Sequence, residues 1–523
     1  MISSKMMFLI LFLLRSVPWA NCSPLHEEFI QCMSDNVTTH DPFSKILHLP
    51  NSQSYENLLE NAQENLRLYN NSLKPLFIIT PYHDSEIRAT ILCSKQKGLQ
   101  IRIKSGGHDY EGLSYRCQTP FVIIDLVYYK AISIDLEQET AWVQSGATLG
   151  ELYVDISRKS DVHGFPAGIC PGVGIGGHFS GGGMGTMMRK YGLAADNVVD
   201  AVIVNADGLT LDRRGMGEDL FWAIRGGGGA SFGVILSWKI KLVRVPQIVT
   251  VFNLRKQMDR EGTKLVYKWQ QIAPNLPPEL FIRILIQLES NIVVGDFNSL
   301  FLGSTEGLIS LMKQRFPELG LRPEDCTEMS WIQSAAFFAG FPNQVEALLN
   351  RSDPFKAKLK GKSDFVTEPI PESALMQIWK RHPEGELLPF MMLDPYGGNM
   401  GEIPDSETPF PHRKGNLYNI LYAVAWNDDD DAGHLKWINE LYMFMEPYVS
   451  KSPRRAYLNY RDLDLGINPG VNPRFSDSAV WGMKYFNANF ERLAKVKSLV
   501  DPNNFFWSEQ SIPPIVNDGP FFA

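Results

Sequence analysis

The spacing of apolar and polar residues changes along the chain near Pro246. Before this proline, short apolar runs such as LFIITP, LQIRIK, FVIIDL and TAWV predict strands. Between them, apolar residues recur at helical spacing in HDSEIRATILCSKQKG. TLGELYVDISRKS begins with Thr148 and carries Glu151 three residues later, which is the pattern of a capping box at a helix start. The first part of the chain is therefore predicted to mix short strands with helices.

After Pro246 the apolar runs are longer. FNLRK, FIRILIQL, NIVVGDFNSLFLGS and NLYNILYAVAW predict strands, several with the period-two alternation of a sheet that is covered on one face. GLISLMKQRF and HLKWINELYMFMEPY predict helices between them, and DSAVWGMKYFNANFERLAKVKSLVDPNNFF predicts one amphipathic helix that ends at Asp-Pro. The predicted fold class is α+β, with an N-terminal α+β domain and a second domain built on a larger antiparallel sheet.

Residues 1–22 have the pattern of a signal peptide. Lys5 supplies a positive charge, residues 6–14 are apolar, and Ala20 and Cys22 are small residues suited to a cleavage site. Arg15 interrupts the apolar run, so a buried first helix is the alternative. No later run approaches the ~20 apolar residues that span a bilayer. We expect a protein of the secretory pathway, extracellular (apoplastic) or vacuolar, without a membrane span.

The secretory route allows disulfides and glycans. Of six cysteines, Cys22 would leave with the signal peptide, so at least one of the other five is unpaired or chemically occupied. Three N-x-S/T sequons are candidate glycosylation sites on surface loops: Asn36, Asn70 and Asn350.

Charge and composition argue against several classes of function. The formal net charge of −8 disfavours nucleic acid as a partner, because phosphate binding favours a basic face. Four consecutive aspartates at 428–431 suggest a metal site, but they point in different directions and predict a solvated loop instead. No other spacing suggests zinc, and the glycine clusters lack the lysine of a P-loop. We therefore expect no metal.

Three glycine clusters point to a cofactor. They are SGGHDYEGLSY at 105–115, GFPAGICPGVGIGGHFSGGGMG at 164–185 and RGGGGASFGV at 225–234. Successive glycines let backbone N–H groups converge on anionic oxygens, and they let a flat ligand lie against the main chain. Tight turns are the alternative, and a Rossmann site is disfavoured because no GxGxxG occupies a clear strand–turn–helix unit. A pyrophosphate-bearing cofactor fits the pattern without any basic residue.

Longer motifs carry a family resemblance. RIKSGGHDYEGLSY, CPGVGIGGHFSGGGMGTMMRKYGLAADNVVDA, AYLNYRDLDLG and VDPNNFFWSEQSIPP resemble the berberine bridge enzyme-like family, a plant group of secreted flavoproteins. The resemblance covers nearly all of the chain after the signal peptide. It implies a vanillyl-alcohol-oxidase (PCMH)-type FAD-binding domain over 23–245, a substrate-binding domain over 246–464, and a segment over 465–523 that returns to the FAD-binding domain.

The resemblance also implies how the cofactor is held. FAD would be attached twice, through His108 to the flavin 8α-methyl group and through Cys170 to C6. His178 would stabilise negative charge near the flavin N1–C2 locus, and Cys32 would pair with Cys93. Other residues implied at the cofactor are Ser105, Gly106, Gly107, Ser114, Gly177, Gly181, Gly182 and Asn459. Cys117 and Cys326 are then expected to be inert core thiols.

The same resemblance implies a reaction with dioxygen. Val173 occupies the position where valine accompanies oxidases in this family. Tyr460 is the candidate catalytic base, and Tyr191 is a second catalytic candidate; a tyrosine acting as a base near neutrality needs a depressed pKa. Relatives carry a lysine and a glutamine or glutamate where this chain has Asn419 and Leu421. This departure disfavours simple alcohol oxidation and predicts a more apolar pocket.

The expected protein is a monomeric, secreted FAD-linked oxidase of plant specialised metabolism. It would take a hydride from a benzylic, allylic or N-methyl carbon of an alkaloid, phenolic or prenylated substrate to flavin N5, with possible ring closure. Dioxygen would reoxidise the flavin and give hydrogen peroxide. The alternatives are a carbohydrate or monolignol alcohol oxidase, a redox-neutral flavin-holding cyclase, and a secreted binding protein with a vestigial flavin.

Overall fold

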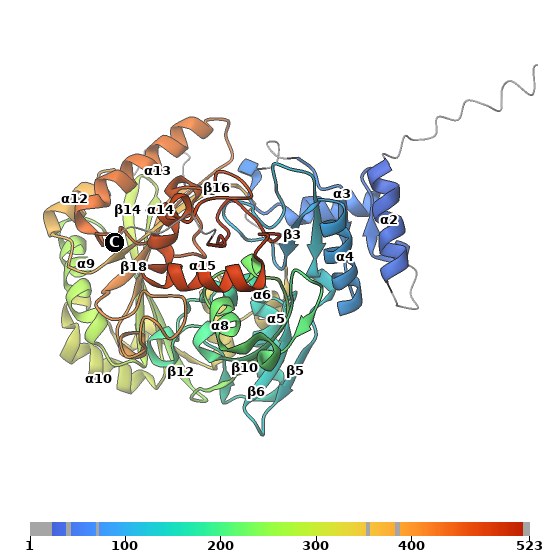
Figure 1. The fold of residues 1–523 in the computed structure, drawn as a ribbon. Helices are drawn as coiled ribbons and strands as arrows, with labels where there is room; N and C mark the ends of the chain where they lie inside the picture. The colour runs from blue at the N-terminus through green and yellow to red at the C-terminus, as the bar shows by residue number, and fades with distance from the viewer. Residues whose placement is uncertain (1–23, 38–42, 69–72, 352–355, 382–387, 516–523) are drawn as a thin grey trace, which may run out of the picture.

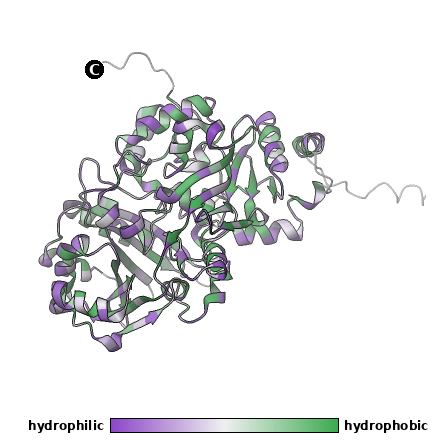
Figure 2. Cartoon of the chain, turned by 90° about the horizontal axis from the view of Figure 1, so that it is seen from below, coloured by the Kyte–Doolittle hydropathy of each residue, from purple (hydrophilic) through white to green (hydrophobic). Residues whose placement is uncertain are grey.

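A computed structural model describes residues 24–37, 43–68, 73–351, 356–381 and 388–515. The predicted signal peptide lies outside these residues. Apolar residues concentrate in the strands and on the inner helix faces (Figure 2). Among the described residues, no helix is both long and apolar enough to cross a membrane.

The first sheet has four strands in the order β1-β2-β4-β3. β2, β4 and β3 run parallel, and β1 is antiparallel to β2. The predicted helix α4 connects β2 to β3. The elements of this part are α2 (Pro24–Asn36), β1 (Leu47–His48), α3 (Gln53–Ala62), β2 (Phe77–Ile79), α4 (Asp84–Gln96), β3 (Gln100–Lys104) and β4 (Phe121–Asp125).

The second sheet has five antiparallel strands in the order β5-β6-β10-β8-β9. The predicted capping box is present: Thr148 and Glu151 cap each other's backbone at the start of α5. The elements here are β5 (Ile132–Asp135), β6 (Thr140–Gln144), α5 (Leu149–Lys159), β7 (His163–Gly164), α6 (Ile175–Ser180), α7 (Met188–Tyr191), β8 (Val198–Val204), β9 (Thr210–Leu211), α8 (Arg213–Ile224), β10 (Val234–Lys241) and β11 (Val243–Arg244).

A seven-stranded antiparallel sheet follows, in the order β15-β12-β14-β13-β17-β18-β16. Alternate residues such as Ile284, Leu393 and Ile420 pack under α9, α10, α12 and α13 on the outer side of this sheet (Figure 1). The other face turns inward. The elements are β12 (Val249–Gln257), α9 (Arg260–Ile272), β13 (Leu280–Glu289), β14 (Ile292–Phe301), α10 (Thr305–Arg315), β15 (Cys326–Met329), α11 (Trp331–Phe338), β16 (Lys358–Val366), α12 (Glu372–Trp379), β17 (Leu388–Pro395), β18 (Tyr418–Trp426) and α13 (Asp431–Met445).

The single C-terminal helix predicted from the sequence is wrong. The segment forms two helices, α14 (Phe475–Phe486) and α15 (Asn489–Val500), because Asn487 adopts a left-handed conformation with φ of 46°. This break lets Trp481 of α14 pack edge-on against Phe490 of α15, with ring centroids 5.5 Å apart. Asparagine tolerates this conformation better than most residues.

The C-terminal segment packs against the glycine-rich part of the chain. The buried Lys497 ammonium donates to the Ser231 carbonyl at 2.6 Å, and the Ile512 N–H donates to the Ser231 hydroxyl at 3.1 Å. The exact limits of the three predicted parts, 23–245, 246–464 and 465–523, stay a prediction.

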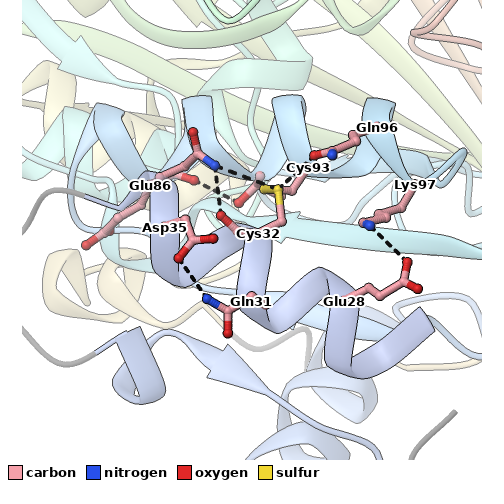
Figure 3. Close-up of a disulfide and its surroundings, with 10 residues drawn as sticks. Glu28, Gln31, Cys32, Asp35, Glu86, Cys93, Gln96 and Lys97 are labelled. Atoms are coloured by element: carbon pink, nitrogen blue, oxygen red, sulfur yellow. Dashed lines mark hydrogen bonds and ion pairs between the residues drawn. A yellow bond between two sulfur atoms is a disulfide. The ribbon is translucent and has the colours of Figure 1, made fainter. Parts of the chain in front are cut away.

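A disulfide between Cys32 and Cys93 joins α2 to α4 (Figure 3). Cys117 is buried as predicted, where its sulfur accepts a hydrogen bond from Arg102. Cys326 is only half-buried on strand β15, so the expectation of a core position is wrong for this residue. Burial nevertheless raises the pKa of the Cys326 thiol to about 11, which disfavours the reactive thiolate.

Asn36 and Asn350 are exposed, as a glycosylation site requires, and Asn70 lies outside the described residues. Glycosylation at all three stays a prediction.

The run of aspartates at 428–431 begins a helix rather than forming only a loop. Asp430 is the N-cap of α13, and its carboxylate accepts a hydrogen bond from the Gly433 N–H. Asp431 pairs with Lys358 at 2.9 Å. These carboxylates therefore have structural partners.

Candidate active site

A cavity of about 500 Å³ lies where the glycine clusters meet the inner face of the seven-stranded sheet. The segments 457–461 and 506–510 complete its wall. Most of the predicted site residues line it: Ser105, Gly106, Gly107, His108, Ser114, Cys170, Val173, Gly177, His178, Gly181, Asn459 and Tyr460. Residues that are more than three hundred positions apart in the sequence thus lie together in one site.

The first two glycine clusters touch backbone to backbone. A Cβ atom added to Gly106 would lie 2.3 Å from the Gly174 nitrogen, and one added to Gly174 would lie 2.1 Å from the Ser105 hydroxyl oxygen. The Ser105 hydroxyl in turn donates to the Ser145 carbonyl at 2.6 Å. No larger residue fits at this crossing, so the glycines are required by packing and leave main chain exposed to the cavity.

The two predicted attachment residues lie in the same region of the cavity. A Cβ atom on Gly172, two residues after Cys170, would lie 3.4 Å from the His108 Nε2 atom. Cys170 is exposed, and His108 is half-buried. Burial and then the neighbouring Cys170 thiol raise the pKa of Tyr110, which follows His108 by two residues. The contacts of the loops therefore bring the imidazole and the thiol to one part of the cavity.

Several features fit a bound FAD. The buried hydroxyl oxygens of Ser114 and Ser145 line the cavity and have no hydrogen-bond partner among the described residues. Gly177 has no atom within 4 Å of an added Cβ, which leaves room beside the main chain. Unpaired buried hydroxyls and bare backbone are what a ligand with many polar oxygens would satisfy.

His178 is neutral in this site. Burial lowers its pKa to about 4, and the exposed remainder of the ring faces the cavity. Its Nε2 atom accepts a hydrogen bond from the Gly168 N–H at 3.0 Å, so the ring proton is on Nδ1. The predicted stabilisation of negative charge would therefore come from a neutral N–H donor, not from an imidazolium cation.

Tyr457 and Asn459 hold the glycine loop in place. The Tyr457 hydroxyl oxygen accepts from the Gly183 N–H at 2.9 Å, the Met184 N–H at 3.2 Å and the Asn459 amide at 2.9 Å. Burial raises the pKa of Tyr457 to about 12, although these donors oppose the shift. A Cβ atom on Gly181 would lie 1.9 Å from the Asn459 amide oxygen, so glycine is required there.

Tyr460 lies among other aromatic rings. It stacks on Tyr110 at 5.9 Å between centroids and meets Tyr457 edge-on at 5.0 Å. Burial and then the Asp394 carboxylate raise the pKa of Tyr460 well above its ordinary value, and Arg283 opposes this only weakly. Tyr460 is therefore a neutral phenol near pH 7 in this environment, and its role as a base stays a prediction.

The inner face of the seven-stranded sheet supplies an apolar wall. Phe390, Met392 and Leu421 line the cavity, and Met392 pairs directly with Leu421 across β17 and β18. Asn419 does not line the cavity, because its amide donates to the Asp364 carbonyl at 2.9 Å. Leu421 thus lines the cavity, and a pocket more apolar than that of relatives stays a prediction.

Two residues of this wall were not predicted from the sequence. Arg283 on β13 and Asp394 on β17 line the cavity and form a buried ion pair at 2.7 Å. The signal in the sequence was a single arginine inside the apolar run FIRILIQL, since a lone charge in a buried strand needs a partner.

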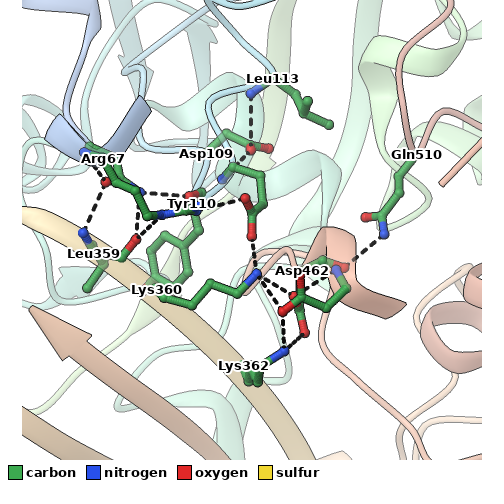
Figure 4. A network of polar contacts seen from close by, with 12 residues as sticks. Arg67, Asp109, Tyr110, Leu113, Leu359, Lys360, Lys362, Asp462 and Gln510 are labelled. Atoms are coloured by element: carbon green, nitrogen blue, oxygen red, sulfur yellow. Dashed lines mark hydrogen bonds and ion pairs between the residues drawn. The ribbon is translucent and has the colours of Figure 1, made fainter. Parts of the chain in front are cut away.

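A network of buried ion pairs links several parts of the chain beside the site (Figure 4). The Lys360 ammonium of β16 lies 2.6 Å from Glu111, which follows the His108 loop, and 2.7 Å from Asp462. Asp462 also pairs with Lys362 at 2.9 Å. Burial opposes protonation of Lys360, but the carboxylates of Asp462, Glu111 and Asp464 outweigh it and raise its pKa. The network joins the first glycine cluster, the sheet and the AYLNYRDLDLG motif at 456–466.

Two predicted site residues lie apart from the cavity. The Tyr191 hydroxyl donates to the Arg244 carbonyl, a backbone contact that keeps it outside the cavity wall. This placement does not support a catalytic role for Tyr191. Gly182 is behind the wall, where a Cβ atom would meet the Phe410 ring at 3.3 Å. Gly182 thus packs against Phe410, and its contact with the cofactor stays a prediction.

Comparison with known proteins agrees with these features. A family model described as an FAD binding domain matches residues 75–213, and one described as "Berberine and berberine like" matches residues 456–513. The first match covers the glycine clusters at 105–115 and 164–185, and the second covers the segment that carries Tyr460.

Full-length relatives are close in sequence and structure. The chain is 51% identical to Berberine bridge enzyme-like 22 of Arabidopsis thaliana, covering 98% of this chain and 99% of that protein. It is 50% identical to tetrahydroberberine oxidase of Berberis wilsoniae, covering 94% of each. The solved structure of BBE-like #28 from Arabidopsis thaliana superposes with a TM-score of 0.89 at 47% identity, covering 94% of this chain and 100% of that chain. The chain therefore belongs to the berberine bridge enzyme-like family of FAD-binding oxidoreductases.

Proposed function

We propose that this protein is a secreted oxidase that removes a hydride from a benzylic, allylic or N-methyl carbon of an aromatic or prenylated plant metabolite. The observation that carries the proposal is the apolar cavity wall of Phe390, Met392 and Leu421, in the same cavity as the stacked rings of Tyr110 and Tyr460. An apolar aromatic substrate is complementary to such a cavity wall, because pockets that bind organic ligands combine apolar walls with few polar groups.

FAD supplies two-electron oxidation when bound, with dioxygen as the terminal acceptor and hydrogen peroxide as the by-product. We assign His108 and Cys170 as its covalent attachment points. Ser114 and Ser145 would donate their otherwise unpaired hydroxyls to it. The Nδ1–H of neutral His178 would donate to an acceptor atom of the cofactor without adding a buried cation.

The protonation states favour some substrates over others. Alcohol oxidation needs a group that takes the hydroxyl proton, and Tyr460 is protonated near neutrality because burial raises its pKa. Removal of a hydride from an N-methyl or activated benzylic carbon needs no such base, because the electrons of the substrate itself stabilise the carbon that loses the hydride. The neutral Tyr460 would then position the substrate as a hydrogen-bond donor. A carbohydrate or monolignol oxidase is the less favoured alternative.

The attachment and the oxidation can be tested together. The secreted protein is precipitated with acid, and flavin is measured in the washed, digested pellet and in the supernatant. Flavin in the pellet of wild type, retained in part by His108→Ala and by Cys170→Ala and released by the double variant, supports two attachments. Flavin only in the supernatant of wild type contradicts covalent attachment.

Peroxide yield distinguishes the candidate reactions. N-methylated tetrahydroisoquinolines, prenylated phenols, coniferyl alcohol and glucose are compared as substrates. One peroxide per product from the first two groups supports the proposal, whereas faster turnover of coniferyl alcohol or glucose favours the alternative. Product without peroxide under air indicates a redox-neutral cyclase. Val173→Leu should slow reoxidation by dioxygen while leaving anaerobic flavin bleaching by substrate intact.

A further inference from the structure

The ion pair in the cavity wall has an unusual position. Arg283 and Asp394 are 7% and 6% exposed and lie on neighbouring strands of the sheet. The other residues of this sheet that line the cavity are apolar: Leu359, Phe390, Met392 and Leu421. The arginine Nε donates to the Asp394 Oδ1 at 2.8 Å, and its Nη2 lies 2.7 Å from the same oxygen. One oxygen of the carboxylate thus takes both contacts from the guanidinium.

The pair leaves hydrogen-bonding groups of both residues available to a ligand. Among the described residues, the Asp394 Oδ2 atom accepts no hydrogen bond, and the Arg283 Nη1 group donates none. Both side chains line the cavity, so their small exposed fraction faces it. The Asp394 carboxylate also contributes to the raised pKa of Tyr460, which places it near that ring. The cavity wall therefore carries a carboxylate oxygen and a guanidinium N–H group that no described residue pairs with.

We propose that Arg283 and Asp394 form a subsite for a neutral hydroxyl group, and that the substrate is a phenol or a similar hydroxylated aromatic compound. This inference rests on the proposed function and narrows its substrate class. A hydroxyl group donates one hydrogen bond and accepts others, so it can satisfy Asp394 Oδ2 and Arg283 Nη1 together. The apolar body of the substrate then lies against Met392 and Leu421.

The charge balance disfavours ionic ligands at this point. The guanidinium and the carboxylate neutralise each other, so a substrate ammonium group would bury a net positive charge and a substrate carboxylate a net negative one. Burying an uncompensated charge is costly, whereas a neutral polar group costs little when its hydrogen bonds are made. An amine cation would also meet repulsion from Arg283, and a carboxylate would meet it from Asp394.

Three probes with one apolar body test the subsite. They are 4-propylphenol, 4-propylanisole and 4-propylbenzylamine, titrated calorimetrically into the holoenzyme without oxygen. Wild type should bind the phenol about tenfold more tightly than the methyl ether, because the ether leaves the Asp394 oxygen without a donor. The ammonium probe should bind more weakly than the phenol.

The variants isolate the pair. Arg283→Met with Asp394→Leu replaces both charges by apolar side chains, which folded proteins tolerate better than removal of one partner. This double variant should bind the phenol and the ether equally. The matched control is Arg255→Met with Asp296→Leu, an ion pair of 2.7 Å on the same sheet that does not line the cavity. The control should keep the wild-type preference, and flavin content should match in all three proteins.

Several outcomes would overturn the inference. These are a wild type without preference for the phenol, an unchanged preference in the Arg283/Asp394 double variant, and tighter binding of the ammonium probe by wild type. Failure of the proposed function looks different, since peroxide would then be missing, or would form faster from coniferyl alcohol or glucose, while the preference for the phenol persists.

Discussion

The substitution Lys360→Met tests how the buried charge network holds the site. The Lys360 ammonium lies 2.6 Å from Glu111 and 2.7 Å from Asp462, and the three side chains are only 2–3% exposed. Methionine keeps an apolar stem of similar length but removes the cation. Arg67 would still pair with Glu111 and Lys362 with Asp462, but three carboxylates, counting the half-exposed Asp464, would then share two cations, so one negative charge would be left uncompensated.

The expected loss of stability follows from this burial. Removing one partner of a buried ion pair costs about 3–5 kcal/mol, because the remaining charge is left uncompensated. Unfolding entropy is about 2.1 cal/mol/K per residue, which gives roughly 1 kcal/mol/K for a chain of this length. The melting temperature should therefore fall by about 3–5 °C, as measured by calorimetry on the holoenzyme.

The control is Lys358→Met, two positions earlier on the same strand, where the ammonium pairs with the exposed Asp431. This change should have little effect, because water screens exposed ion pairs. The combination Lys360→Met with Asp462→Asn restores the charge balance and should recover part of the loss. Equal melting temperatures for the Lys360 and Lys358 variants would refute the argument, as would a further loss in the combined variant.

Four other perturbations give separate checks. His178→Gln should flatten the acid dependence of stability: native His178 has a pKa of about 4, below its ordinary 6.5, so wild type loses up to ~3 kcal/mol as the pH falls from 6.5 to 4. The denaturation midpoint of each protein is measured at pH 7 and at pH 4.5. An equal change in midpoint for both proteins would contradict the prediction. Gly181→Ala should lower flavin content and melting temperature, since its methyl group would lie 1.9 Å from a neighbouring side-chain oxygen. The added methyl group of Gly177→Ala would have no atom from outside its own helix within 4 Å. This variant should therefore fold normally and lower the flavin content without lowering the melting temperature. Replacing Cys32 and Cys93 by serine should reduce the free energy of unfolding by up to ~4 kcal/mol for a separation of 61 residues, and an unchanged denaturation midpoint would argue against this constraint.

Local patterns predicted local structure well. The capping box at Thr148 is present, because it depends on residues three positions apart. The helical spacing around Asp84–Gln96 and the alternating runs after Pro246 also formed the expected elements. The C-terminal helix failed, because apolar periodicity continues through Asn487 while the packing of two helices requires a break there.

Family motifs placed most of the cofactor residues at the cavity but not all of them. Tyr191 belongs to a strong motif, and its hydroxyl nevertheless bonds to a distant carbonyl, at Arg244. A motif identifies a segment of the chain, but it does not show on which side of that segment a side chain lies. The protonation of Tyr460 was equally hidden, since burial and the Asp394 carboxylate come from other parts of the chain.

The sequence by itself determined the glycine-rich loops, the family, the FAD chemistry and the alternation that builds each sheet, because these depend on neighbouring residues or on long motifs. Only the tertiary structure decided which distant side chains share the cavity. Arg283 and Asp394 are 111 positions apart, and Glu111 and Lys360 are 249 positions apart. Hydrophobic periodicity shows which face of an element is buried, but the partner of a buried charge depends on how the elements pack.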